Sequence, residues 1–306
     1  MPTSSLPLRV SFSGSHPALR WLLYQFQRRG GQVELLQDAE LLSGPYGLSQ
    51  PFLKILGTSP LNWPLEWCLH QIEGRVMYGM EAEQLVLRDA SPYPLHQLDL
   101  PRIYREIELL KDTQTDTASE GGQPFSIRWT FESETLDDVW LMEWQIPLSV
   151  VPSGMIWESQ GTNSCWYMQH GFEGEGVTFV AGEIKADSEA AARKVALKEL
   201  PPFMLGFQPS DIRRLLHQQP PGLRPCPVFW PRIYLKDRGL HIVSAPPDMS
   251  LTGLLREGYL WWLMQQLLTF LNTRHPTPEQ VLERLTLLEQ KMRTVLTPFL
   301  RNHRLF

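Results

Sequence analysis

The sequence has few cysteines, and they form no pattern. Only three of its 306 residues are cysteine, at Cys68, Cys165 and Cys226, and none belongs to a C-x-x-C pair. Small secreted scaffolds contain a dense, even set of cysteines, and structural zinc sites use closely spaced pairs. The sequence therefore argues against both classes of protein and predicts reduced, buried thiols.

Basic residues are in the minority, since 28 Lys and Arg stand against 33 Asp and Glu and give a net charge of -5. A protein that binds nucleic acid along its phosphates usually carries a positive excess, so the net charge does not indicate this partner. A nucleic-acid-associated protein is our third hypothesis, and it rests on four local arginines: Arg213, Arg214, Arg301 and Arg304. For the tail, the simpler interpretation is that cations are stabilised at the C-terminal end of a helix.

Long apolar runs are also missing. The uncharged segment 258–273 is shorter than the roughly 20 apolar residues that a membrane helix needs, and Gln265 and Gln266 interrupt it. Residues 1–10 contain one arginine and nothing that resembles a secretory signal. We therefore predict a buried helix at 258–273, no membrane span and a cytoplasmic location.

The common catalytic signatures are absent from the chain. It contains no G-x-x-x-x-G-K-[ST], G-x-G-x-x-G, H-E-x-x-H or G-x-S-x-G motif. Its eight histidines stand apart, without metal-ligand spacing. The sequence thus predicts no cofactor and no metal site, and it argues against an enzyme without excluding one.

The composition is that of a folded protein, with 42% hydrophobic and 20% charged residues. The order of strand and helix patterns predicts a mixed α/β and α+β fold with an N-terminal β-α-β unit, a central, largely antiparallel sheet with a helix, and a C-terminal αα-hairpin. We divide the chain into an α/β region at 1–111, a linker or disordered loop at 112–123, and an α+β region at 124–306 with a proline-rich surface segment.

The N-terminal unit has the clearest local pattern. Strands are predicted at 8–12 and 32–36, on either side of a helix that begins at Pro17 and ends before two glycines. Ser15 or His16 is expected to cap this helix. Such a β-α-β unit favours parallel strands with a right-handed crossover.

The loop inside this unit is our candidate ligand site, because the N-terminus of a helix that follows a strand attracts anions. It consists of Ser13, Gly14, Ser15 and His16. The loop resembles that of the PP-loop ATP pyrophosphatases, which reads Ser-Gly-Gly-x-Asp-Ser, but Ser15, Pro17 and Ala18 depart from the pattern and identify no family. The second hypothesis is therefore a nucleotide-binding or nucleotide-using enzyme that works through residues 8–29, and the alternative is an ordinary helix cap.

The central region alternates apolar and polar residues. Strands 125–131 and 139–146 are predicted to form an antiparallel hairpin with one aromatic face buried. Further strands are expected at 155–158, 165–169 and 177–185, followed by a helix at 189–200.

Four glutamates fall around this predicted sheet: Glu158, Glu173, Glu175 and Glu183. With His170 they suggest acid–base chemistry or a cation site. The glycines beside Glu173 and Glu175 equally suit a solvated turn, and no pattern indicates a closed pocket.

Clear sequence patterns predict two helices in the C-terminal part of the chain. Residues 277–280 match a capping box, and apolar residues recur from Val281 to Phe299 at spacings of four and three. The preceding helix, 254–271, is apolar on several sides. We predict that one of its aromatic side chains stays exposed and forms an interface, the candidates being Tyr259, Trp261 and Trp262. The leading hypothesis is therefore a non-catalytic subunit or accessory protein of an intracellular multi-protein assembly, with a protein partner or self-association.

Overall fold

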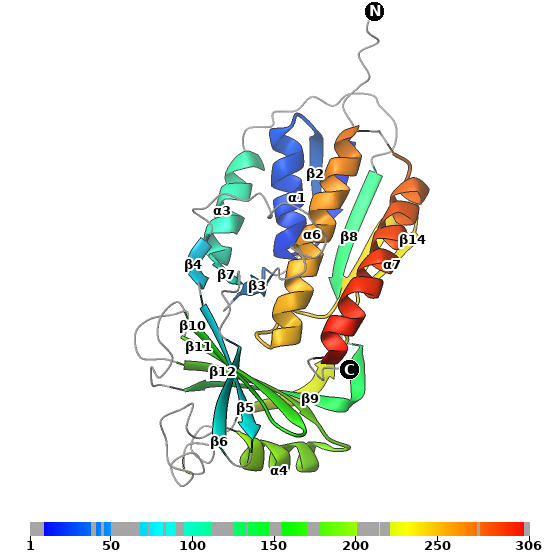
Figure 1. Ribbon diagram of the computed structural model, residues 1–306. Helices are drawn as coiled ribbons and strands as arrows, with labels where there is room; N and C mark the ends of the chain where they lie inside the picture. The colour runs from blue at the N-terminus through cyan, green and yellow to red at the C-terminus, as the bar shows by residue number, and fades with distance from the viewer. Residues whose placement is uncertain are drawn as a thin grey trace, which may run out of the picture.

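The computed structural model confirms the predicted mixed α/β and α+β class (Figure 1). It describes residues 9–37, 41–43, 46–49, 68–72, 74–81, 84–89, 95–111, 125–132, 134–146, 155–170, 178–200, 214, 221–273 and 276–302. These residues form a five-stranded sheet with a layer of helices, a seven-stranded sheet with one helix, and a small three-stranded sheet.

The five-stranded sheet has the strand order β14-β15-β8-β1-β2. Its strands are β1 (Arg9–Ser13), β2 (Gln32–Gln37), β8 (Phe125–Phe131), β14 (Arg232–Lys236) and β15 (Gly239–Ser244). β1 pairs in parallel with both β2 and β8, and only β14 is antiparallel to its neighbour. Helix α1 (Pro17–Arg28) connects β1 to β2, so the predicted β-α-β unit is confirmed.

Local chemistry explains where α1 begins and ends. His16 is the N-cap, and its side chain accepts the backbone N–H of Ala18, while Pro17 fills the first helical position, where no N–H is needed. At the other end Gly30 adopts a φ of +85°, the left-handed conformation that favours glycine.

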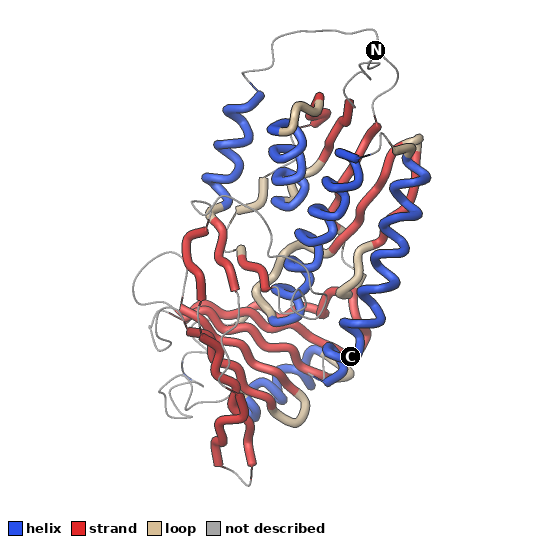
Figure 2. The backbone as a smooth tube through the Cα atoms, turned by 45° about the horizontal axis from the view of Figure 1, so that its top comes forward, coloured by secondary structure: helices blue, strands red, loops and turns tan. Residues whose placement is uncertain are grey.

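One layer of helices covers a face of the five-stranded sheet (Figures 1 and 2). Across the sheet they follow the order α3 (Leu100–Lys111), α1, α6 (Leu251–Thr273) and α7 (Pro278–Asn302). No helix in the described part of the chain combines the length and apolar character that a membrane crossing requires.

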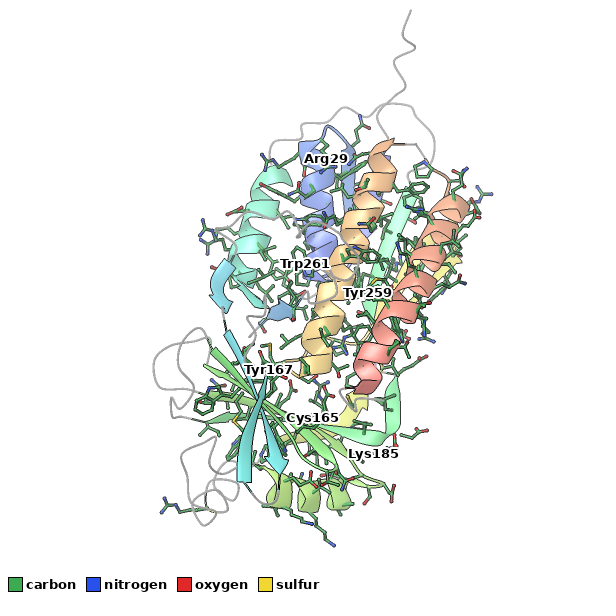
Figure 3. The ribbon with its side chains drawn as sticks, in the orientation of Figure 1. Arg29, Cys165, Tyr167, Lys185, Tyr259 and Trp261 are labelled. Carbon is green, nitrogen blue, oxygen red and sulfur yellow. The ribbon has the colours of Figure 1, made fainter. Side chains whose placement is uncertain are left out.

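The expected exposed aromatic on α6 is not found. Tyr259 and Trp261 are fully buried, and Trp262 is 3% exposed. The prediction is wrong because α6 lies between α1 and α7 and also contacts β3, so the chain itself covers these three aromatic side chains (Figure 3). The ring of Trp261 contacts that of Trp21 on α1, with centroids 5.7 Å apart.

The capping box of α7 is confirmed, because Thr277 N–H donates to the Gln280 side chain and Gln280 N–H donates to Thr277 Oγ1. The apolar stripe is confirmed over its first half, where Val281, Leu285, Leu288 and Met292 are buried. Beyond Met292 the buried positions shift to 296 and 300, because a straight helix of 3.6 residues per turn drifts from a strict seven-residue repeat.

The seven-stranded sheet has the order β13-β9-β12-β11-β10-β5-β6 and is antiparallel except between β10 and β5. Its strands are β5 (Gly74–Glu81), β6 (Gln84–Asp89), β9 (Thr135–Ile146), β10 (Met155–Gln160), β11 (Ser164–His170), β12 (Thr178–Lys185) and β13 (Gly222–Pro227). Helix α4 (Glu189–Glu199) packs on one face. The three-stranded sheet joins β3 (Gly47–Ser49), β7 (Leu95–Leu98) and β4 (Cys68–Ile72).

The predicted hairpin of 125–131 with 139–146 is wrong. β8 pairs with β1 and β15 in the five-stranded sheet, whereas β9 pairs with β12 and β13 in the other. Both segments alternate as expected, but alternation identifies a buried face and does not select the pairing partner. The chain passes from one sheet to the other just after Phe131.

Both sheets contain strands from either side of residues 112–123, so this segment does not separate the two sheets. Its proposed role as a linker stays a prediction, because residues 112–124 lie outside those described.

Replacing Gly182 with alanine is expected to destabilise the protein. A Cβ at Gly182 would overlap Cζ3 of Trp166, whose ring is buried and held by an N–H···O bond to Ser164. Overpacking of this kind costs about 1–3 kcal/mol. The matched control is Gly222→Ala, whose Cβ would meet only Glu143 O, at 3.7 Å. Urea unfolding of both variants tests this, and equal stabilities would contradict it.

Candidate functional site

The loop predicted to bind a ligand is buried. Of its residues, Ser13, Ser15 and His16 are 7%, 5% and 0% exposed. Gly14 has a φ of +137°, and a Cβ there would lie 2.6 Å from the carbonyl oxygen of Trp129. Only glycine fits this turn, which brings β8 against the end of β1.

His16 accepts the backbone N–H groups that an anion at the N-terminus of α1 would need. Its Nδ1 accepts the N–H of Ala18 at 3.1 Å, and its carbonyl oxygen accepts the N–H groups of Leu19 and Arg20 at 3.0 and 3.1 Å. Pro17 has no N–H. The first turn of α1 is therefore bonded to its own cap, and the loop's role as a ligand site stays a prediction.

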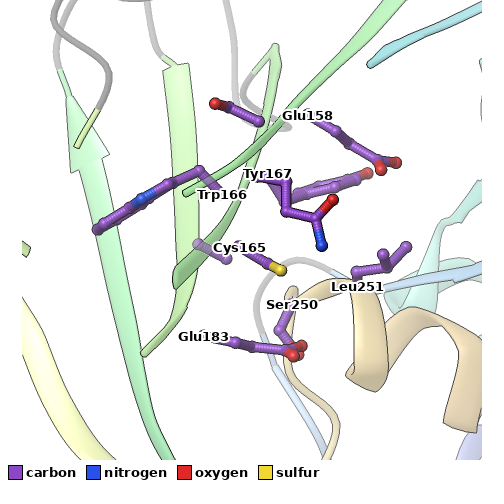
Figure 4. Close-up of a pocket in the computed structure, with 10 residues that line it drawn as sticks. Glu158, Cys165, Trp166, Tyr167, Glu183, Ser250 and Leu251 are labelled. Atoms are coloured by element: carbon purple, nitrogen blue, oxygen red, sulfur yellow. The ribbon is translucent and has the colours of Figure 1, made fainter. Parts of the chain in front are cut away.

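A different part of the molecule contains a pocket, which lies between the seven-stranded sheet and the beginning of α6 (Figure 4). We call it the sheet–helix pocket. The empty space between its lining residues is about 400 Å³, which includes open solvent. Its polar lining includes Glu158, Gln160, Cys165, Tyr167, Glu183 and Ser250.

Strand register brings these side chains together. Cys165 on β11 lies opposite Glu183 on β12, and two residues further along β11 Tyr167 lies opposite Glu158 on β10. Because side chains alternate along a strand, all four share one face of the sheet. The other face carries Trp166 and its apolar neighbours, which pack beneath α4.

Glu183 connects this sheet to α6. Its side chain is 6% exposed, and Oε1 accepts the N–H of Thr252 in the first turn of α6 at 2.9 Å. Burial raises its pKa from 4.5 to about 7; hydrogen bonds from Thr252 and Ser250 lower the pKa, and Asp248 raises it further. A carboxyl group with this pKa can both accept and donate a proton near neutral pH.

The start of α6 is held by a buried polar cluster. Ser250 Oγ accepts the N–H of Gly253 at 2.9 Å as a helix cap, and Asp248 accepts the N–H of Ser250 at 3.0 Å. Arg256 in turn donates to Asp248 at 2.7 Å and to the Pro246 carbonyl oxygen at 2.8 Å. These bonds fix the helical wall of the pocket.

Of the four glutamates singled out in the sequence, the structure brings Glu158 and Glu183 to one pocket, which sequence reasoning did not expect. Glu173 and Glu175 lie outside the described residues, and the His170 side chain is not described. Sequence reasoning missed Cys165, Tyr167 and Ser250 as site residues. The spacing of Cys165 and Tyr167, two residues apart on β11, was available as a signal that they share a face, but nothing local indicated that α6 would cover this face.

The four arginines of the nucleic-acid hypothesis gain no support. Arg213 and Arg304 lie outside the described residues, Arg214 is exposed, and the Arg301 side chain on α7 is not described. Their contact with a nucleic acid stays an untested prediction.

No protein-family model matches the chain, and no curated protein matches it in sequence. Solved structures do share its fold. PqsL of Pseudomonas aeruginosa, described as a probable FAD-dependent monooxygenase, aligns with a TM-score of 0.59 and 12% identity over 96% of this chain and 94% of its own. Klebsiella pneumoniae HpxO, crystallised with FAD and uric acid, gives 0.53 and 10% over 91% and 83%. The tetracycline destructase Tet(55) gives 0.53 and 10% over 97% and 87%.

These similarities overturn the leading hypothesis from the sequence. Two structures that share this fold, PqsL and a protein of Photorhabdus luminescens, are described as FAD monooxygenases, and HpxO was crystallised with FAD, which contradicts the predicted non-catalytic accessory subunit. The sequence did not predict this likeness because it contains no G-x-G-x-x-G motif.

The residues at the α1 loop do not fit FAD. In dinucleotide-binding β-α-β units the loop reads G-x-G-x-x-G; the second glycine lets the backbone approach the pyrophosphate, and the third allows close packing of helix on strand. Counted from Gly14, those positions hold His16 and Leu19. The His16 side chain fills the place that the second glycine leaves open, so the loop has no room for the pyrophosphate of a flavin dinucleotide.

Glu183→Gln is expected to change how stability depends on pH. Because the folded pKa of Glu183, about 7, exceeds its usual 4.5, the folded protein binds more protons than the unfolded chain between these values. The stabilising contribution of Glu183 is therefore full below about pH 4.5 and is lost as the pH rises through about 7, on the order of a few kcal/mol. A glutamine side chain cannot ionise, so this loss should disappear in the variant.

Urea unfolding at about pH 5 and about pH 8 measures the difference. Glu189→Gln, at an exposed residue of α4, is the control and should retain the wild-type dependence. The same pH dependence in Glu183→Gln and wild type would contradict the raised pKa.

Proposed function

We propose that the chain is an enzyme that converts a small polar organic molecule in the sheet–helix pocket, with Glu183 as the proton acceptor and donor. The observation that carries this proposal is the position of Glu183, a buried carboxyl group on the wall of a pocket that is partly open to solvent. Its pKa of about 7 suits both roles at neutral pH.

The other lining residues support binding and orientation. Tyr167 offers an aromatic ring, and its hydroxyl group donates to Gln169 at 3.0 Å, which fixes the ring in place. Glu158 adds a second carboxyl group across the strand pair from Tyr167. A ligand with polar groups on a planar frame would meet both kinds of surface.

The proton-transfer step needs no electron acceptor. Glu183 as a carboxylate removes a proton from a substrate atom, and as a carboxylic acid it returns a proton to a substrate atom, so the residue is regenerated in each cycle. Tautomerisation and the addition or removal of water are reactions of this type. The fixed start of α6 keeps the carboxyl group in place during the cycle.

The similar structures support the class of substrate. HpxO was crystallised with uric acid, and Tet(55) is a tetracycline destructase, so two proteins with this fold are associated with polar ring compounds. A compound panel for this chain therefore begins with purine-like and polycyclic, oxygen-rich molecules.

Pocket occupancy can be measured at Cys165. A bound molecule should slow alkylation of this thiol, whereas Cys226 serves as an unreactive reference because it is buried and burial raises its pKa. Peptide mass spectrometry follows each cysteine separately. If no compound in the panel slows alkylation of Cys165, the proposed binding site is wrong.

Compounds that protect Cys165 are then incubated with the enzyme in D₂O, and their deuterium content is measured. Wild type should incorporate solvent deuterium, and Glu183→Gln should do so about 100-fold more slowly or less. Glu189→Gln should match wild type. Equal rates in Glu183→Gln and wild type would exclude Glu183 as the acid–base group.

A further inference from the structure

The space around the N-terminus of α1 is filled by side chains from four other parts of the chain. We call this space the α1 crevice and define it by His16, Trp129, Glu257, Tyr46 and Tyr104. All five side chains are buried, and their residues are at most 6% exposed. In a parallel α/β fold, this crevice at the carboxyl ends of the strands is where a dinucleotide would lie.

The imidazole of His16 is held on three sides. It stacks on the ring of Trp129 with centroids 3.9 Å apart, and its Nδ1 caps α1. Its Nε2 lies 3.1 Å from Oε2 of Glu257, and both side chains have no exposed surface. A ring fixed in this way cannot rotate aside for a ligand without losing all three contacts.

Glu257 makes the crevice unsuited to phosphate. Its carboxyl oxygen accepts the hydroxyl proton of Tyr46 at 2.6 Å, and the indole N–H of Trp261 donates to the same hydroxyl oxygen at 2.6 Å. A pyrophosphate needs donors, but Glu257 presents acceptor oxygens. Burial and the nearby Glu257 hold the pKa of Tyr46 well above its usual value, so its hydroxyl group keeps the proton that it donates.

Helix α3 closes the remaining side. Its Tyr104 donates a hydrogen bond to the carbonyl oxygen of Ser15 at 2.9 Å. The loop that precedes α1 is thus hydrogen-bonded to α3 and packed against Trp129 of β8. The chain's own side chains thus occupy the space in which a dinucleotide would otherwise lie.

We propose that the α1 crevice is permanently occupied by the chain itself, with the His16–Glu257 pair standing in place of a pyrophosphate, and that the protein does not bind FAD. His16 satisfies the helix N-terminus as an internal ligand. The crevice then stabilises the folded protein, and the proposed reaction takes place in the sheet–helix pocket. This inference is independent of the reaction proposed for that pocket.

Flavin binding by the full-length wild-type chain tests the proposal directly. The protein is incubated with excess FAD, desalted and denatured, and released flavin is measured by absorbance. We expect essentially no flavin, and no rise in melting temperature with increasing FAD, because a ligand of the native state would raise it. Stoichiometric bound flavin, or a melting temperature that rises with FAD, would overturn the proposal.

Stability measurements test the internal pair. His16→Ala and Glu257→Gln should each lower the melting temperature, and the double variant should lose less than the sum, because each single change leaves a buried polar group without its partner. His241→Ala, at a partly exposed histidine of β15, should have little effect. If His16→Ala does not fold, His16→Gln replaces it.

A His16 variant as stable as wild type would overturn the filled-crevice proposal. These readouts are separate from alkylation of Cys165 and deuterium incorporation, which report on the sheet–helix pocket. Failure of one proposal is therefore distinguishable from failure of the other.

Discussion

Burial of charge at the start of α6 is the constraint on which the packing of α6 against the five-stranded sheet and α1 depends. Arg256 is 1% exposed, and removing a guanidinium group from water costs several kcal/mol unless it is paired and hydrogen-bonded. Burial alone would lower the pKa of Arg256, but Asp248 and Glu257 hold it above its usual value. Asp248 comes from the segment that leaves β15, and Glu257 faces the loop before α1. The charge is thus balanced only when β15, α6 and α1 are all in place.

Local features of the fold could be read from the sequence. Pro17 and His16 gave the start of α1, and the box at Thr277–Gln280 gave the start of α7, because a helix end is decided by residues within one turn of it. Strand pairing could not be read in this way. β8 and β9 adjoin in the chain yet belong to different sheets, since their partners are set by contacts far away in the sequence.

Some residues of the candidate site could likewise be predicted from local sequence patterns. Glu158 and Glu183 stand out as acidic residues in apolar strands, and the pairing of their strands with β11 places them on one face with Cys165 and Tyr167. Helix α6 covers that face and so forms the pocket. Its Thr252 donates a backbone N–H to Glu183, although the two residues are 69 positions apart in the sequence. The interpretation of Ser13–His16 as a ligand loop was correct about its position between strand and helix. It could not foresee that Glu257, 241 residues after His16, would fill the space beside it.

The order of strands in the five-stranded sheet also affects how the protein is made. β1 is an interior strand of that sheet, but its neighbour β8 is synthesised more than one hundred residues later, and β15 completes that side later still. The first β-α-β unit therefore leaves the ribosome with an open strand edge and an uncovered apolar helix face. Pairings so distant along the chain slow folding and expose the nascent protein to aggregation. The N-terminal third depends on the C-terminal third for its folded state, so truncation after the first unit would leave a fragment that requires chaperones.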